Sequence, residues 1–129
     1  MTNWETQALL SDHYKNPRHW GMLHRGKSAT GNSPGCGDEQ IIYVDETDGE
    51  VTRLRFQATG CALSRAATSI MLECVADDPR SIVPTLDQTF FIEILGADVV
   101  HSRPKCTMLG LTILQDLYLG RRAHDAAAP

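Results

Sequence analysis

The amino-acid sequence predicts an α+β fold, with a small antiparallel sheet of about three strands and helices packed on one face of it. Three observations predict this class. A hairpin pattern occupies the middle of the chain, a helical stripe follows it directly, and a second helical tract lies near the carboxyl end. Helices that follow an antiparallel sheet in this order bury their apolar stripes against one face of the sheet.

The amino-terminal third is expected to hold one helix and an arm. Apolar residues recur from Trp4 to Tyr14 at the spacing of a short amphipathic helix, which should stop before Pro17. Residues 18–33 are rich in Gly, His, Lys and Ser and predict an irregular, exposed arm. The segment that precedes Cys36 could add a third strand.

The hairpin is predicted from two apolar runs around a turn signal. Residues 41–44 form the first run and residues 51–56 the second, and Thr47-Asp48-Gly49 lies between them. Gly after Asp is typical of the tight turns that join antiparallel strands.

Beyond Cys61 the apolar residues recur every three or four positions, which is typical of a helix with one buried face. This stripe contains Leu63, Ala66, Ala67, Ile70, Met71, Cys74 and Val75, and Asp77-Asp78-Pro79 ends it. A second helix is predicted from Cys106 to about Tyr118. One or two short helices are expected between them, around residues 82–83 and 90–95.

Length and charge limit the classes of function. A chain of 129 residues that is 42% hydrophobic fits one domain over residues 1–129. Its last residues, from about 122 to 129, are expected to be frayed. A net charge of −4 with scattered Lys and Arg argues against nucleic acid as a partner. With no apolar run of about 20 residues and no secretory signal pattern, we expect a cytoplasmic protein without a membrane partner.

The four cysteines are expected to be reduced in that compartment, as metal ligands, sulfur carriers or buried side chains. Cys36, Cys61 and Cys106 lie at the ends of predicted elements, where their side chains can converge. Cys74 lies on the apolar stripe far along the helix from Cys61, so we expect it in the core.

Local chemistry favours a shared metal site, although no CxxC pair is present. Cys61 and Cys106 start predicted helices, where the helix dipole favours the thiolate. Asp38 could supply an oxygen as fourth ligand, or it could be a turn or capping residue. His101 could replace a ligand, but we expect it to be a solvated loop residue.

Four segments together resemble the U-type iron–sulfur cluster assembly scaffold family, which includes IscU, SufU and the amino-terminal domain of NifU. They are DHYKNPRHWG (residues 12–21), CGD (36–38), FQATGCALS (56–64) and RPKCTML (103–109). The resemblance runs from about residue 5 to residue 119. Its motifs stand in the family's order at about the family's distances.

The resemblance implies an iron–sulfur assembly protein that accepts sulfur from a cysteine desulfurase and passes its product to recipient apo-proteins or carriers. Its implied ligands are Cys36, Asp38, Cys61 and Cys106, holding zinc or a transient [2Fe–2S] cluster. Lys105, just before the third cysteine, resembles SufU, whereas the spacing of the second and third cysteines resembles IscU. A zinc-dependent sulfurtransferase therefore stays open as an alternative, and a module with a purely structural zinc is a third.

Cys106 is expected to be the thiol that takes sulfur, supported by Arg103 and Lys105. Cys61 is expected to have the helix dipole but no adjacent cation. The resemblance does not extend to the LPPVK segment that IscU presents to its Hsp70 chaperone, because residues 99–103 read VVHSR. This difference argues against a dedicated chaperone step.

Overall fold

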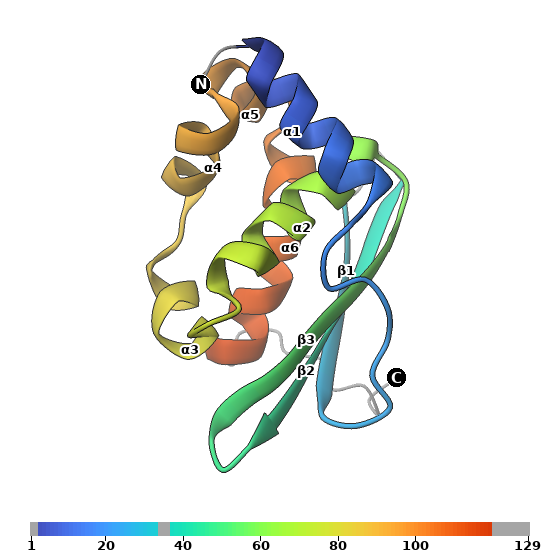
Figure 1. Cartoon of the computed structure of the whole chain (residues 1–129), viewed down its shortest axis with the longest axis vertical. Helices are drawn as coiled ribbons and strands as arrows, with labels where there is room; N and C mark the ends of the chain where they lie inside the picture. Colours follow the sequence, from blue (N-terminus) through green and yellow to red (C-terminus); the bar gives the residue numbers. More distant parts are fainter. Residues whose placement is uncertain (1–2, 34–36, 120–129) are drawn as a thin grey trace.

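The sheet consists of three antiparallel strands in the order β1-β2-β3. A computed structural model describes residues 3–33 and 37–119 of the chain. In it the strands are β1 (Lys27–Ser33), β2 (Asp38–Thr47) and β3 (Glu50–Thr59). The helices lie on one side of this sheet, as Figure 1 shows, so the predicted α+β class is confirmed.

The hairpin between β2 and β3 turns at two residues. Asp48 and Gly49 have φ angles of 54° and 82°, in the left-handed region. A two-residue turn with both φ angles positive matches the right-handed twist of the strands that it joins. The antiparallel hairpin predicted around this turn signal is therefore confirmed, with a register shift at Asp45 and Glu46.

The helices follow the order that periodicity predicts, with one addition. They are α1 (Asn3–Lys15), α2 (Ala62–Val75), α3 (Pro79–Ile82), α4 (Gln88–Leu95), α5 (Ala97–Ser102) and α6 (Pro104–Leu119), with a 3₁₀ turn η1 (Val83–Thr85). In Figure 1, α2 and α6 lie side by side against the sheet, and α1 crosses the beginning of α2. The addition is α5, which begins directly after Gly96.

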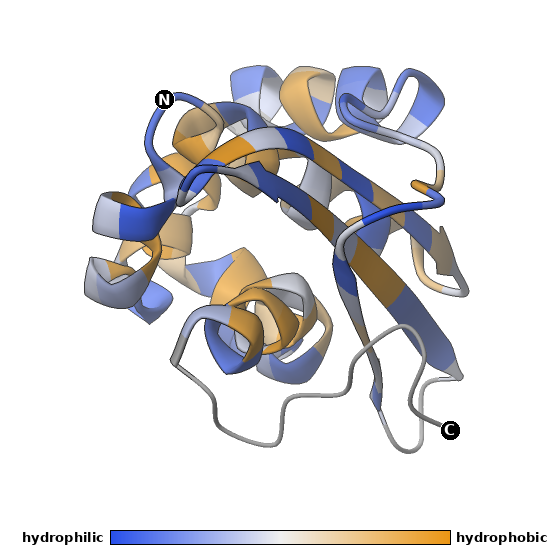
Figure 2. Ribbon diagram, turned by 90° about the horizontal axis from the view of Figure 1, so that it is seen from below, coloured by the Kyte–Doolittle hydropathy of each residue, from blue (hydrophilic) through white to orange (hydrophobic). Residues whose placement is uncertain are grey.

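The core lies between the inner face of the sheet and helices α2 and α6. Ile42 pairs with Ala29 on one side and Phe56 on the other, and all three side chains are buried. Alternate residues of a strand point to opposite faces, which produces the bands of orange and blue along the strands in Figure 2. Met71 of α2 and Leu114 of α6 are also fully buried.

Helix α1 is attached to α2 through a buried histidine. Nδ1 of His13 lies 2.7 Å from Oγ of Ser69, and that oxygen accepts a hydrogen bond from the backbone N–H of Arg18 at 2.8 Å. The Ser69 hydroxyl thus contacts both His13 and Arg18, and Nε2 of His13 faces an oxygen of Glu73 at 3.8 Å. Burial is the main cause that lowers the pKa of His13.

Two expectations about local structure are wrong. The arm predicted for residues 18–33 is irregular only in its first part. Residues 27–33 form β1, which confirms the third strand suggested for the segment before Cys36. Cys74 is exposed rather than in the core. It lies in the last turn of α2, where the packed elements leave its side chain open. In the described ranges 3–33 and 37–119, no helix has the length and apolar character needed to cross a membrane.

Candidate metal centre

Three of the predicted ligands meet at one end of the molecule. Asp38 is the first residue of β2, Cys61 immediately precedes α2, and Cys106 lies in the first turn of α6. One oxygen or sulfur atom from each lies within 4.8 Å of the other two. Residues distant in sequence therefore converge because two helix starts and one strand start face the same point.

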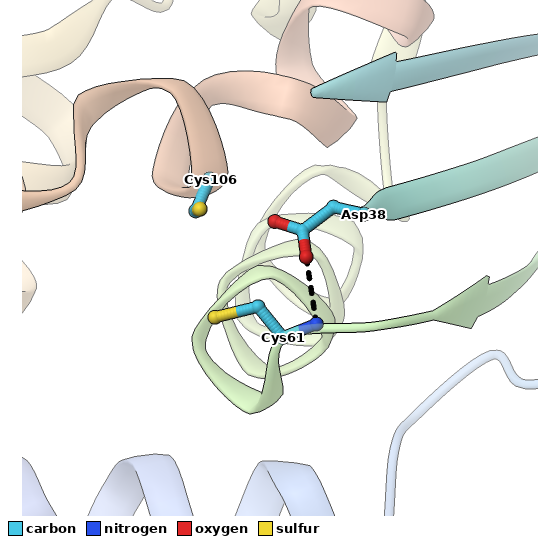
Figure 3. A group of neighbouring side chains, drawn as sticks. All are labelled: Asp38, Cys61 and Cys106. Carbon is cyan, nitrogen blue, oxygen red and sulfur yellow. Dashed lines mark hydrogen bonds between the residues drawn. The ribbon is translucent and has the colours of Figure 1, made fainter. Parts of the chain in front are cut away.

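Asp38 has one oxygen engaged and one without a partner. Its Oδ1 accepts a hydrogen bond of 2.7 Å from the backbone N–H of Cys61, drawn as a dashed line in Figure 3. Its Oδ2 is buried and has no hydrogen-bond partner in the described part of the chain. The residue is 1% exposed. An unpaired, buried carboxylate oxygen is costly in water-free surroundings, which is a reason to expect a cation there.

Gly60 allows β3 and β2 to approach closely beside this carboxylate. Its φ is +100°, and a Cβ at this position would lie 2.7 Å from Oδ1 and 2.9 Å from Cα of Asp38. Any larger residue would therefore displace Asp38. The glycine that precedes Cys61 in the sequence is thus part of the architecture of the site.

The donor set fits a tetrahedral zinc ion. Zinc–sulfur bonds of about 2.3 Å place the ligand atoms of a tetrahedral ion about 3.8 Å apart. The three ligand atoms here lie within 4.8 Å of one another, so each pair would have to approach by about 1 Å at most to bind zinc. Two sulfurs and one carboxylate oxygen occupy three tetrahedral positions and leave one for a further ligand. Cys36, the fourth predicted ligand, lies outside the described residues.

Arg103 contacts Cys61. Its Nη1 donates a hydrogen bond of 3.0 Å to Sγ of Cys61, so the expectation that Cys61 lacks an adjacent cation is wrong. Cys106 is 2% exposed, whereas Cys61 is partly exposed. Lys105 is exposed, and His101 is an exposed residue of α5 rather than of a loop.

Sequence reasoning missed a group of buried polar residues next to these ligands. Gln40 is 1% exposed, and its side-chain amide hydrogen-bonds to Ser64 and Thr68 of α2. Its position carried a signal, because inward residues of β2 alternate and Gln40 lies between Asp38 and Ile42 on that face. A glutamine at an inward strand position indicates a buried hydrogen-bond network.

Comparisons with known proteins show the family and the fold of this chain. The family model of the NifU-like N terminal domain matches residues 5–118. The chain belongs to this family. A NifU-like protein (N-terminal) from Brucella abortus has the same fold, with a TM-score of 0.68 at 19% identity over 95% of this chain and 100% of that chain.

Curated relatives of this NifU-like domain carry two kinds of name. The zinc-dependent sulfurtransferase SufU of Bacillus subtilis is 35% identical over 70 residues, 54% of this chain and 47% of that protein. The iron–sulfur cluster assembly scaffold protein IscU of Streptococcus pyogenes is 32% identical over 91 residues, 70% of this chain and 57% of that protein. IscU of Aquifex aeolicus is 31% identical over 116 residues, 87% of this chain and 73% of that protein. The chain thus spans about half the length of the first two relatives.

Proposed function

We propose that this NifU-like domain is an iron–sulfur cluster assembly protein, which accepts sulfur from a cysteine desulfurase and holds a metal or a nascent [2Fe–2S] cluster. The observation that carries the proposal is the convergence of Asp38, Cys61 and Cys106, with a buried carboxylate oxygen left unpaired. The names of the curated relatives support it. In this proposal residues 1–129 act as one cytoplasmic domain that delivers its product to recipient or carrier proteins.

The proposed ligands are Cys36, Asp38, Cys61 and Cys106. A bound metal supplies positive charge that keeps the cysteine ligands deprotonated at neutral pH. The hard carboxylate oxygen of Asp38 is a weaker ligand for soft iron–sulfur units than a fourth thiolate, which favours release of the cargo. Its engaged Oδ1 keeps the carboxylate oriented through the backbone of Cys61.

The sulfur-transfer step is thiol exchange without net oxidation. The acceptor thiolate attacks the terminal sulfur of the persulfide on the desulfurase, the sulfur–sulfur bond breaks, and the desulfurase cysteine leaves as a thiolate. Cys106 is the proposed acceptor, with Lys105 and Arg103 drawing in the anionic persulfide. Because Cys106 is buried, its sulfur must become more exposed before it reacts. Cys61 competes, since it is partly exposed and contacts Arg103.

A zinc-dependent sulfurtransferase without stable cluster assembly is the alternative. Two features support it: the zinc-compatible donor set and the similarity to a protein named for this activity. Lys105 also matters for the choice between these two functions. A protonated lysine does not bind a metal, so Asp38 remains as the oxygen ligand. A module with a purely structural zinc is the third function.

The test combines desulfurase with the purified domain. We expect the domain to raise the rate at which the desulfurase of the same organism converts cysteine, and a persulfide to appear on the domain by intact mass and peptide mapping. Persulfide lost in Cys106→Ser but retained in Cys36→Ser and Cys61→Ser would support Cys106 as the acceptor. Loss in Cys61→Ser alone would assign the role to Cys61.

Anaerobic addition of ferrous iron then separates the two sulfur-accepting functions. Visible absorption and circular dichroism of an iron–sulfur cluster on the domain indicate assembly. Persulfide formation without a cluster indicates the sulfurtransferase. If the domain neither stimulates the desulfurase nor receives sulfur, the proposal is wrong and the structural zinc module is favoured.

A further inference from the structure

Gln40 connects strand β2, which begins with Asp38, to helix α2, which begins directly after Cys61. Its Nε2 donates hydrogen bonds to the backbone oxygen of Ser64 at 3.1 Å and to Oγ of Ser64 at 2.7 Å. Its Oε1 accepts a hydrogen bond of 2.8 Å from Oγ1 of Thr68. All three residues are 1% exposed, so water does not compete for these bonds.

The contacts of Gln40 lie one layer below the metal ligands. Gln40 follows Asp38 by two positions on the same strand face, and Ser64 follows Cys61 by three positions, close to one helical turn. The bond between Asp38 and the Cys61 backbone and the bonds between Gln40 and Ser64 are therefore consecutive connections between β2 and α2. Together they fix the distance and the rotation between the two elements.

The same layer includes the helix that carries Cys106. Gly110 follows Cys106 by four positions on α6, and a Cβ at Gly110 would lie 2.9 Å from Cγ2 of Thr68. The backbone of α6 thus packs directly on Thr68, the residue whose hydroxyl Gln40 holds. A change in the position of Thr68 would shift α6, and with it Cys106, relative to the other two ligands.

We infer that Gln40 is a positioning residue, which sets the separation of Asp38, Cys61 and Cys106 and thereby the affinity of this domain for its metal. Gln40 is not one of the proposed ligands. It acts through the hydrogen bonds to α2 and through the contact of Thr68 with α6. The part of this inference that concerns metal affinity rests on the proposed function. The part that concerns the placement of the three residues does not, because it depends only on how β2, α2 and α6 pack.

The experiment compares Gln40→Met with a matched control, Gln115→Met. Methionine approximates the length of glutamine and tolerates burial but makes no strong hydrogen bonds. Gln115 also donates two hydrogen bonds from its amide, to the backbone oxygens of Val83 and Leu86, on residues outside the metal site. Both variants thus lose buried or half-buried amide contacts, and urea unfolding of the full chain measures the loss of stability in each.

Zinc affinity, measured by competition with a chromophoric chelator, is the first readout. We expect Gln40→Met to bind zinc about 10-fold to 100-fold more weakly, as is usual when residues that orient ligands are changed. We expect Gln115→Met to stay within about twofold of the unchanged domain, since the contacts it loses do not orient a ligand. With cobalt(II) in place of zinc, the ligand-field bands should change in Gln40→Met and not in the control.

A double-mutant cycle tests whether Thr68 transmits the effect. Thr68→Val removes the hydroxyl with little change of shape, and we expect its loss of zinc affinity to be smaller than that of Gln40→Met. Because both changes break one network, the losses should not add in the double variant. Additive losses would contradict a shared network.

The second readout needs no metal. In the metal-free domain the buried Cys106 should react faster with a maleimide in Gln40→Met than in Gln115→Met, with the site of labelling identified by peptide mapping. Equal zinc affinity, equal cobalt spectra and equal labelling rates in the two variants would overturn the inference. If the unchanged domain bound no zinc, the zinc-dependent alternative of the proposed function would be wrong, and the labelling rates would still decide whether Gln40 positions the site.

Discussion

Asp38→Asn separates the two roles of the carboxylate. The amide oxygen of asparagine can still accept the hydrogen bond from the backbone N–H of Cys61, which Oδ1 of Asp38 now accepts at 2.7 Å. The second oxygen, buried and without a partner among the described residues, becomes an NH₂ group that cannot bind a cation. The metal-free protein should therefore change little in stability, because the hydrogen bond stays and one buried, unpaired polar group replaces another.

The magnitude follows from linkage between metal binding and folding. Zinc at about 100 times its dissociation constant stabilises a folded protein by about 2.7 kcal/mol. If the loss of one ligand weakens binding about 100-fold, the same zinc concentration contributes only about 0.4 kcal/mol. For a domain of this size the difference corresponds to roughly 10 °C in melting temperature. Differential scanning calorimetry with and without zinc measures it directly.

Ser33→Ala is the control for this prediction. Ser33 pairs with Asp38 across β1 and β2, and its buried hydroxyl also has no hydrogen-bond partner in the described ranges. It should retain the full zinc-dependent increase in melting temperature, because a neutral hydroxyl is a poor zinc ligand. An Asp38→Asn protein that zinc stabilises as much as the unchanged domain would show that the carboxylate does not hold the metal.

Three further predictions concern other residues. Gly60→Ala should lower the free energy of unfolding by about 1 to 3 kcal/mol and weaken zinc binding, because its positive φ and the contact with Asp38 admit no Cβ; unchanged urea unfolding would contradict this. Cys74→Ser should leave zinc content and the urea midpoint unchanged, since the side chain is exposed; loss of zinc would make it a ligand. Burial lowers the pKa of His13 from 6.5, so it contributes stability above about that pH that is lost as the pH falls. His13→Gln should flatten the decrease in urea midpoint between about pH 7.5 and about pH 5.5; an equal decrease in both proteins would exclude His13 as its source.

Periodicity in the sequence predicted the long elements of the fold. Helices α1, α2 and α6 and the β2–β3 hairpin each contain enough repeats of their pattern to stand out from neighbouring residues. Strand β1 did not, because its sequence KSATGNS has few apolar side chains and becomes a strand through pairing with β2. Helix α5 is only six residues long, too short to show a helical repeat.

For the site, the sequence indicated which residues converge but not which atoms pair. Helix starts at Cys61 and Cys106 follow from patterns within each helix, so their common location was predictable. The contact of Arg103 with Cys61 depends on how α5 packs before α6, which no local pattern encodes. Cys74 was misplaced for a similar reason, since a helical stripe does not reveal where along the helix the covering elements end.

The proposed metal ligands are spread over much of the chain, and this has a consequence for synthesis. Asp38 and Cys61 leave the ribosome long before Cys106, which lies in the last helix that the structure describes. A growing chain therefore carries an incomplete set of ligands until α6 has been made and has packed against α2. If these residues hold the metal, as proposed, nascent or truncated chains would bind it weakly, and only molecules whose fold is finished would present the complete site.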